Sequence, residues 1–311
     1  MNIVFLGTGE IAIPTFRALL ESEHRVAALV TQPDKPVGRR SEPQPPAIKV
    51  VAQEAGIPVL QPERIKSPEA LAELAALSAE VMVVMAYGQI LPQKLIEMPS
   101  KAIINLHASL LPKYRGASCI QSAILNDDAE TGWTVMHVVK ALDAGDIIEA
   151  RPMVIAKDET GESLHDRLAE AGPDSLLAAL EEIASGSDRR TPQDEELTCY
   201  APKLEREDGR LDWSRPAAEI ERQIRAFHTW PGTFTTFVDG KRKEKRLKVF
   251  PQVQLSKESG QPGGIQVDSE SHEVRVACGE GSLVLSEVQP EGAKRMAAQE
   301  FLRGNAVEKL G

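Results

Sequence analysis

The sequence is poor in cysteine and has no long hydrophobic run. Its 311 residues include three cysteines, Cys119, Cys199 and Cys278, an odd number that lacks the spacing of a zinc site. No stretch approaches the roughly 18 uninterrupted apolar residues of a membrane span. Met1 and Asn2 lead straight into the strand-like Ile3–Leu6, without the features of a signal peptide. These absences predict a cytoplasmic protein with no membrane partner, disulfide framework or metal centre.

Basic residues are too few to balance the acidic ones, and the net charge is −10. Residues 206–311 hold 17 of the 36 basic and 16 of the 46 acidic residues. Positions 1–205 therefore hold 19 basic and 30 acidic residues. The densest basic run, Lys241–Lys248, lies in the more balanced second part. Local patches of this kind matter more for phosphate contacts than total charge does. The run therefore supplies the candidate phosphate-binding residues Lys241, Arg242, Lys243 and Lys245.

The first part of the chain alternates strand-like apolar runs with helical patterns, as a parallel sheet requires. The expected strands are residues 2–6, 25–31, 80–86, 101–105 and 133–139, and the expected helices are 13–22, 46–55, 68–78, 118–126 and 162–185. The length favours two domains. The pattern predicts an α/β fold with a Rossmann-like, mostly parallel sheet in residues 1–185, followed by a polar linker over 186–205.

After residue 206 the pattern becomes one of short strands. Residues 234–238 and 247–250 flank an Asp239-Gly240 turn and predict a hairpin with the basic run at its tip. Residues 264–267, 274–278 and 283–288 add further strands. Residues 206–311 are therefore expected to form a smaller antiparallel β-barrel.

An amide, an imidazole and a carboxylate form the candidate catalytic set. Asn105 and His107 follow the strand end at Ala102–Ile104, and Asp143 lies in the turn Leu142–Asp146. Open α/β sheets hold ligands at the carboxyl ends of their strands. The set suits acyl transfer to an amine, which needs a donor for the developing oxyanion and a group that moves a proton. Taken singly, an Asn or His at a strand end is more often a turn or capping residue, and Asp143 in its turn could be a turn former.

Several longer motifs occur along the chain in a fixed order. They are VTQPDKPVGR, GIPVLQPERI, AYGQILP, HASLLPKYRGAS, YAPKLEREDGRLDW, RAFHTWPGTF and QPEGAKRM. In these motifs and in the spacing of Asn105, His107 and Asp143, the chain resembles the folate-dependent formyltransferases over nearly its whole length. The match extends to the branch of this family that formylates methionyl initiator tRNA.

The resemblance implies a formyl donor, a nucleic-acid partner and an assignment of sites. The donor is 10-formyltetrahydrofolate, used without a metal, and the family's folate contacts fall on Ser109, Leu110, Leu111, Pro112, Ala86, Tyr87, Gly88, Gln89, Ile90 and Leu91. The acceptor is methionyl initiator tRNA, met by Arg39 and Arg40 in the loop Gln32–Pro46 and by the basic hairpin of an OB-like C-terminal domain. We expect a monomer. Cys119 stands where the family usually has Pro, and we expect it to perturb a helix start and not the chemistry.

Two alternatives remain open on sequence grounds. Gly7–Ala12 after a strand, with Asp34 beyond it, fits the loose dinucleotide-binding pattern of a nicotinamide-dependent oxidoreductase. A folate formyltransferase that acts on a small amine would share the catalytic set, although the basic run and the YAPKL, WPG and QPEG segments argue against it. His24, His137, His165 and His272 are interpreted as structural. His228, in the TWPG segment, has no evident role.

Overall fold

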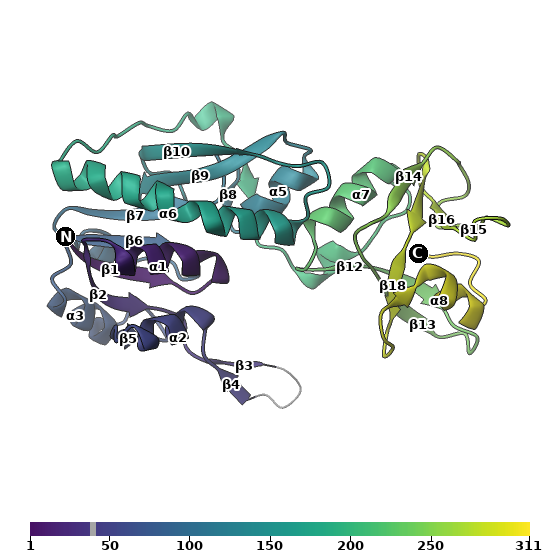
Figure 1. Ribbon diagram of the computed structural model, residues 1–311, viewed down its shortest axis with the longest axis horizontal. Coiled ribbons are helices and arrows are strands. Elements are labelled where there is room, and N and C mark those ends of the chain that lie inside the picture. The colour runs from purple at the N-terminus through teal and green to yellow at the C-terminus, as the bar shows by residue number, and fades with distance from the viewer. Residues whose placement is uncertain (38–41) are drawn as a thin grey trace. The chain divides into compact units, whose positions relative to one another are not determined.

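A seven-stranded sheet organises the first part of the chain in the computed structural model, which describes residues 1–37 and 42–311 (Figure 1). The strand order is β10-β9-β7-β6-β1-β2-β5. The pairs from β7 to β5 are parallel, whereas β9 runs antiparallel to β7 and β10. The bounds are β1 Asn2–Gly7, β2 Arg25–Val30, β5 Val59–Leu60, β6 Val81–Met85, β7 Ala102–His107, β9 Glu130–His137 and β10 Ile147–Val154. The predicted mostly parallel α/β sheet is confirmed.

Helices cover both faces of this sheet, so β1 is buried on both sides. On one face Phe5 meets Phe16 of α1 with ring centroids 5.1 Å apart, and Trp133 donates from Nε1 to the Leu168 carbonyl of α6 at 2.7 Å. On the other face Val4 belongs to a cluster with Leu74 of α3. In chain order, the helices of residues 1–185 are η1 Glu10–Ala12, α1 Ile13–Glu21, α2 Ala47–Glu54, α3 Pro68–Ala76, α4 Gln93–Ile96, α5 Cys119–Leu125 and α6 Gly161–Ser185. None of the described helices is long and apolar enough to cross a membrane.

The strands around the candidate catalytic set are longer than predicted. β7 continues to His107 because its last residues pair with β9, with Asn105 opposite Met136 and His107 opposite Thr134. β9 begins at Glu130 because it is also bonded to β10, which the sequence did not reveal. The first part also holds an unpredicted short pair, β3 Lys35–Val37 with β4 Glu42–Gln44. β10 carries charged residues and is half exposed, so it lacks the apolar run of the central strands.

The segment predicted as a linker is partly structured. It contains η2 Glu195–Leu197 and β11 Tyr200–Ala201, and β11 pairs in parallel with β8 Arg115–Gly116. By its internal contacts the chain divides into two compact units. Unit 1 comprises residues 1–119, 130–154 and 165–201, and unit 2 comprises residues 120–129, 155–164 and 202–311. Polar composition alone did not show that this segment is bonded to unit 1.

Unit 2 contains two four-stranded sheets, β12-β13-β18-β19 and β14-β17-β16-β15, whose neighbours are all antiparallel. The strands are β12 Thr233–Val238, β13 Glu244–Val249, β14 Gln254–Ser256, β15 Ile265–Val267, β16 Val274–Ala277, β17 Ser282–Leu285, β18 Glu287–Pro290 and β19 Met296–Ala297. The helices are η3 Arg206–Gly209, α7 Ala217–Ala226 and α8 Ala298–Gly304, together with residues 120–125 of α5 and 161–164 of α6. The β-rich character predicted for this part is confirmed, although residues 283–288 are divided between two strands.

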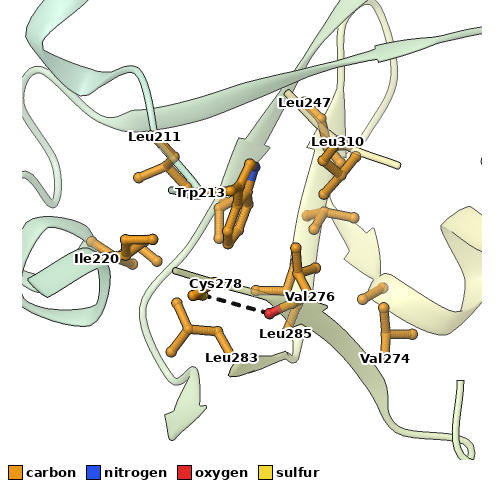
Figure 2. Close-up of a cluster of buried hydrophobic side chains, with 14 of the residues drawn as sticks. Leu211, Trp213, Ile220, Leu247, Val274, Val276, Cys278, Leu283, Leu285 and Leu310 are labelled. Carbon is orange, nitrogen blue, oxygen red and sulfur yellow. Dashed lines mark hydrogen bonds between the residues drawn. The ribbon is translucent and has the colours of Figure 1, made fainter. Parts of the chain in front are cut away.

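One hydrophobic cluster fills unit 2 (Figure 2). Trp213 lies within it and donates from Nε1 to Thr235 Oγ1 at 2.9 Å, so its polar atom is satisfied. Phe237 and Phe301 meet edge to face with centroids 5.0 Å apart. Cys278 donates from Sγ to the Val276 carbonyl at 3.6 Å. These contacts join strands and helices from the whole of residues 211–310 into one core.

The predicted hairpin is present as β12 and β13, with Val238 opposite Glu244. The second strand begins earlier than expected, at Glu244, so Lys245 lies in β13 and not at the tip. Lys241, Arg242 and Lys243 form the connection between the strands. The alternation of exposed charged residues with buried Leu247 and Val249 explains why a charged run can be a strand.

Candidate active site

The three side chains of the predicted catalytic set meet at the end of β7. Asp143 Oδ2 lies 3.7 Å from Nδ1 of His107, and Asp143 Oδ1 lies 3.5 Å from Nδ2 of Asn105. Asn105 and His107 are two residues apart in one strand, so they project to the same face of the sheet. Asp143 comes from the loop between β9 and β10.

The Asp143 carboxylate is fixed by a backbone donor. Gly116 N donates to Asp143 Oδ2 at 2.8 Å. Gly116 has a φ of +118°, and a Cβ there would lie 2.5 Å from the Ala201 carbonyl oxygen, so only glycine fits. Asp143 itself has a φ of +48°, in the left-handed region that few residues other than Gly, Asn and Asp tolerate. The close approach of β8 and β11 thus places the donor for Asp143.

His107 is buried and surrounded by acceptors. Its Nε2 lies 2.9 Å from the Tyr114 carbonyl oxygen, so this nitrogen carries the proton and donates. Burial by itself lowers the pKa of His107, but the hydrogen-bonded sulfur of Cys119, the Asp143 carboxylate and the Tyr114 carbonyl raise it to about 9. These neighbours therefore favour the protonated imidazole over the neutral one.

Cys119 contacts the candidate catalytic set through His107. It begins α5, as the sequence suggested, and its side chain is buried. Its sulfur also hydrogen-bonds His107, a contact that the sequence did not indicate. The contact depends on the loop Ser109–Ser118, which returns the chain to β7 after ten residues. Cys119 thus brings a hydrogen-bonding sulfur to the imidazole of the candidate catalytic set.

A cavity of about 320 Å³ opens at the carboxyl ends of β6 and β7. Asn105 and Asp143 belong to its polar lining, together with Gln89, His137 and Lys140, whereas His107 is not among the lining residues and lies behind Asp143. Ile90 and Leu142, which are 92% and 61% exposed, place apolar surface at its rim. The remaining lining residues are Val84, Leu91, Ile96, Met136, Val138, Val139, Ala141, Ala144 and Gly145. A mostly apolar cavity with a few convergent polar groups is typical of a small-molecule site.

The residues assigned to folate by resemblance divide into three groups. Gln89, Ile90 and Leu91 line the cavity. Ala86, Tyr87 and Gly88 precede them in the turn after β6, where Tyr87 is buried in the core and Ala86 and Gly88 have positive φ. The 109–112 segment is not among the lining residues in the described chain. It is anchored to β9 instead, because Leu111 N donates to Thr134 Oγ1 at 3.0 Å.

The sequence interpretation missed part of the cavity wall. His137, which was interpreted as structural, lines the cavity, and its Nε2 lies 3.0 Å from Asp188 Oδ2. Burial lowers the pKa of His137. The five residues that follow it, 138–142, line the same wall. The sequence could have indicated this wall only through position, because residues 138–142 connect the end of a predicted strand to the turn that carries Asp143.

The Gly7–Ala12 turn packs against the neighbouring strand, and the Asp34 carboxylate is hydrogen-bonded within the protein. A Cβ at Gly7 would lie 3.1 Å from the Met85 carbonyl oxygen, so the turn packs β1 closely on β6. Asp34 accepts from Lys49 Nζ at 2.8 and 2.9 Å and from Gln61 Nε2 at 2.7 Å. These partners occupy the carboxylate that a dinucleotide ribose would need.

The candidate tRNA-binding residues differ in their surroundings. Arg39 and Arg40 lie outside the described residues. Lys245 Nζ is 3.0 Å from Asp239 Oδ2, so its charge is partly compensated. Lys241, Arg242 and Lys243 are exposed at the hairpin tip. Asp239 accepts backbone hydrogen bonds from Lys241 and Lys243 at 2.8 and 2.9 Å, which orders the turn that carries them.

Comparison with known proteins identifies the family. Residues 1–180 match the family model for formyl transferases, and residues 203–306 match the model for the formyl transferase C-terminal domain. The chain is 50% identical over 306 residues to the methionyl-tRNA formyltransferase of Akkermansia muciniphila, covering 98% of this chain and 97% of the relative. It is 45% identical over 297 residues to that of Pseudomonas paraeruginosa, covering 96% and 94%. The chain belongs to the methionyl-tRNA formyltransferase family.

Solved structures share the fold of this family at low identity. HypX from Aquifex aeolicus in complex with tetrahydrofolic acid is 19% identical, with a TM-score of 0.64 over 96% of this chain, which spans 46% of HypX. The sugar 3N-formyl transferase WlaRD is 17% identical, with a TM-score of 0.64 over 94% of this chain and 99% of its own. Membership of the methionyl-tRNA formyltransferase family, and not of an oxidoreductase family, therefore follows from the sequence relatives, and the structures establish the shared fold.

Proposed function

We propose that this enzyme transfers the formyl group of 10-formyltetrahydrofolate to the amino group of methionyl initiator tRNA, acting as a cytoplasmic monomer. The observation that carries the proposal is the convergence of Asn105, His107 and Asp143 beside one cavity. The chain's likeness to methionyl-tRNA formyltransferases over both parts supports the choice of acceptor.

The cavity suits the pterin end of a folate. Its volume of about 320 Å³ lies in the range of small-ligand sites, and its apolar rim can cover the faces of a flat ring. Gln89 is anchored to the loop that follows β5, because its Oε1 accepts from Ile65 N at 2.8 Å. The backbone after Gln89 is therefore held in place at the rim. The turn 86–88 and the 109–112 loop would support these walls from outside the cavity. Bound folate would supply the formyl carbon beside Asn105 and Asp143.

The catalytic set can stabilise charge and move a proton. Attack by the methionine amine places negative charge on the formyl oxygen, and the Asn105 NH2 group can donate to that oxygen. Asp143 faces the same cavity and can accept the proton that the attacking amine loses. The His107 imidazolium lies behind the carboxylate and stabilises its negative charge. A proton returned to the departing nitrogen completes the transfer.

Unit 2 offers two surfaces for tRNA. The first is the hairpin tip with Lys241, Arg242 and Lys243. The second is a groove of about 540 Å³ that includes Arg206, Lys248 and Trp230, the last 49% exposed. Cations beside an exposed aromatic ring suit a phosphate chain and a stacked base. We also propose that the two sheets of unit 2 form an OB-like barrel, a fold often used for nucleic acid.

A competition among acceptors tests the function. The purified enzyme with 10-formyltetrahydrofolate is given methionyl initiator tRNA, methionyl elongator tRNA or a small amine such as glycinamide ribotide. We expect rapid formylation of the initiator tRNA alone. Formylation of only the small amine would reject the tRNA proposal while leaving folate-dependent transfer intact.

A further inference from the structure

The segment from Thr191 to Ala201, here called the strap, is fixed to the strands around the Asp143 loop. At its beginning Thr191 exchanges two backbone hydrogen bonds with Ile147, at 2.8 and 3.1 Å. At its end Tyr200 and Ala201 form β11, which pairs with β8. All of these residues belong to unit 1. The strap therefore lies across the loop that presents Asp143.

Within the strap, the Gln193 amide reaches the backbone of the Asp143 loop. Gln193 Nε2 donates to the carbonyl oxygen of Asp143 at 2.8 Å and to that of Gly145 at 2.8 Å. An amide nitrogen has two hydrogens, and each finds an acceptor here. One side chain thus ties two carbonyls of the turn together, and one of them belongs to Asp143 itself.

Arg115 fixes which way the Gln193 amide faces. Its guanidinium is buried and donates from Nε and Nη2 to Gln193 Oε1, at 3.0 and 2.9 Å. The same group donates to the two carboxylate oxygens of Glu195 at 3.1 and 2.8 Å. A guanidinium can only donate, so the amide oxygen must face Arg115 and the amide nitrogen must face the loop.

The Asp143 loop needs such support because its backbone is strained. Asp143 has a φ of +48°, and a residue held in the left-handed region persists only where its surroundings over-determine the conformation. The carboxylate is held by Gly116 N at 2.8 Å, and the carbonyl is held by Gln193 at the same distance. Gly116 follows Arg115 in β8. This one strand therefore holds the carboxylate directly through Gly116 and the carbonyl indirectly, through Arg115 and Gln193.

We propose that Gln193, oriented by Arg115, is a positioning residue that holds Asp143 beside Asn105 and His107 for formyl transfer. The inference rests on the proposed function, since it concerns the same site. It assigns a role to a residue in a segment that the sequence pattern classed as a linker. Removal of the amide would release the carbonyls of Asp143 and Gly145 without altering a side chain that lines the cavity.

The Gln193→Glu variant separates the two halves of this contact. The new carboxylate keeps an acceptor for Arg115 but presents oxygen, not N–H, to the two loop carbonyls. Gln193→Ala removes the group without adding charge and is the second variant if the first is unstable. Glu196→Gln is the matched control, because Glu196 is an exposed strap residue that does not bond to the Asp143 loop or to Arg115.

We expect Gln193→Glu to lower kcat about 10- to 100-fold, as small displacements of a reacting group do. The KM values for folate and tRNA should change less than about twofold, and the control should match the parent enzyme in all three constants. The His107 imidazole, followed by NMR titration, should titrate at lower pH in Gln193→Ala, since it loses its nearby carboxylate and no new charge is added.

Two results would overturn the inference. One is a normal kcat in both Gln193 variants, and the other is a lowered kcat with an unmoved His107 titration. If the parent enzyme fails to formylate methionyl-tRNA, the proposed function falls, but the NMR titration still tests whether Gln193 holds Asp143.

Discussion

Asp143 and His107, 36 positions apart in the sequence, are joined by a 3.7 Å approach of Oδ2 to Nδ1. The carboxylate faces the cavity while the imidazole stands behind it. In the proposed mechanism Asp143 is therefore the residue that exchanges a proton with the substrate, and His107 acts on the substrate only through Asp143.

The first prediction concerns Asn105, whose amide lines the cavity. Asn105→Ala should lower kcat about 100-fold or more, because it removes a preorganised donor to a developing oxyanion. Asn105→Asp keeps the shape but removes the NH2 donor, so its defect should be at least as large. Steady-state kinetics with methionyl initiator tRNA provides the measurement. Turnover within a few-fold of the parent enzyme would remove Asn105 from the chemistry.

The second prediction compares two carboxylates of one loop. Asp143→Asn should depress kcat much more than Asp146→Asn, because only Asp143 lines the cavity and approaches His107. Both variants preserve side-chain volume, but Asp143→Asn should also unfold at the lower temperature, because it removes the carboxylate beside His107. If Asp146→Asn proved the more damaging in kcat, the proton acceptor would have been assigned to the wrong residue.

The third prediction concerns the pKa of His107, which is raised to about 9 from 6.5. Imidazolium is then required for full activity, so kcat should fall as pH rises through about 9. The raised pKa also stabilises the fold fully below pH 6.5, and this contribution disappears as pH rises from 6.5 to about 9. Both effects can be measured, the first by kinetics and the second by chemical unfolding.

A substitution of Cys119 tests what raises the pKa of His107. Cys119→Ala removes a group that raises the pKa of His107, so the imidazole should titrate at lower pH by NMR. Cys119→Ser keeps a hydrogen-bonding group of similar size and serves as the comparison. An unchanged His107 titration in Cys119→Ala would mean that Asp143 and the Tyr114 carbonyl suffice.

The fourth prediction separates tRNA binding from chemistry. The double variant Lys241→Ala, Lys243→Ala should raise KM for charged tRNA and flatten the salt dependence of affinity by about 0.7 to 0.9 slope units for each phosphate that is no longer bound. Lys245→Ala should have a smaller effect, because Asp239 already compensates Lys245. Lys257→Ala, an exposed lysine outside the tip, is the control. Unchanged affinity and slope in the double variant would make the tip an ordinary solvated surface.

Local sequence pattern accounts for the sheet class of both parts and for the choice of chemistry. Alternation of apolar strands with helices predicted the mostly parallel sheet, and short strands after residue 206 predicted the β-rich second part. The motifs around Asn105, His107 and Asp143 indicated the chemistry, because amide, imidazole and carboxylate groups were present at strand and turn positions. Neighbouring residues suffice to produce such signals, so no knowledge of the packing was needed to read them.

The meeting of distant groups at the site depended on the packing of the whole fold. Gln193 contacts a loop 48 residues away in sequence, and its polar strap carried no periodic signal. Cys119 reaches His107, and His137 reaches the cavity, because loops return the chain to the same sheet edge. β10 was not predicted because its half-exposed, charged residues lack an apolar run. Short-range pattern holds no information about such contacts, since they form between segments that are neighbours only in space.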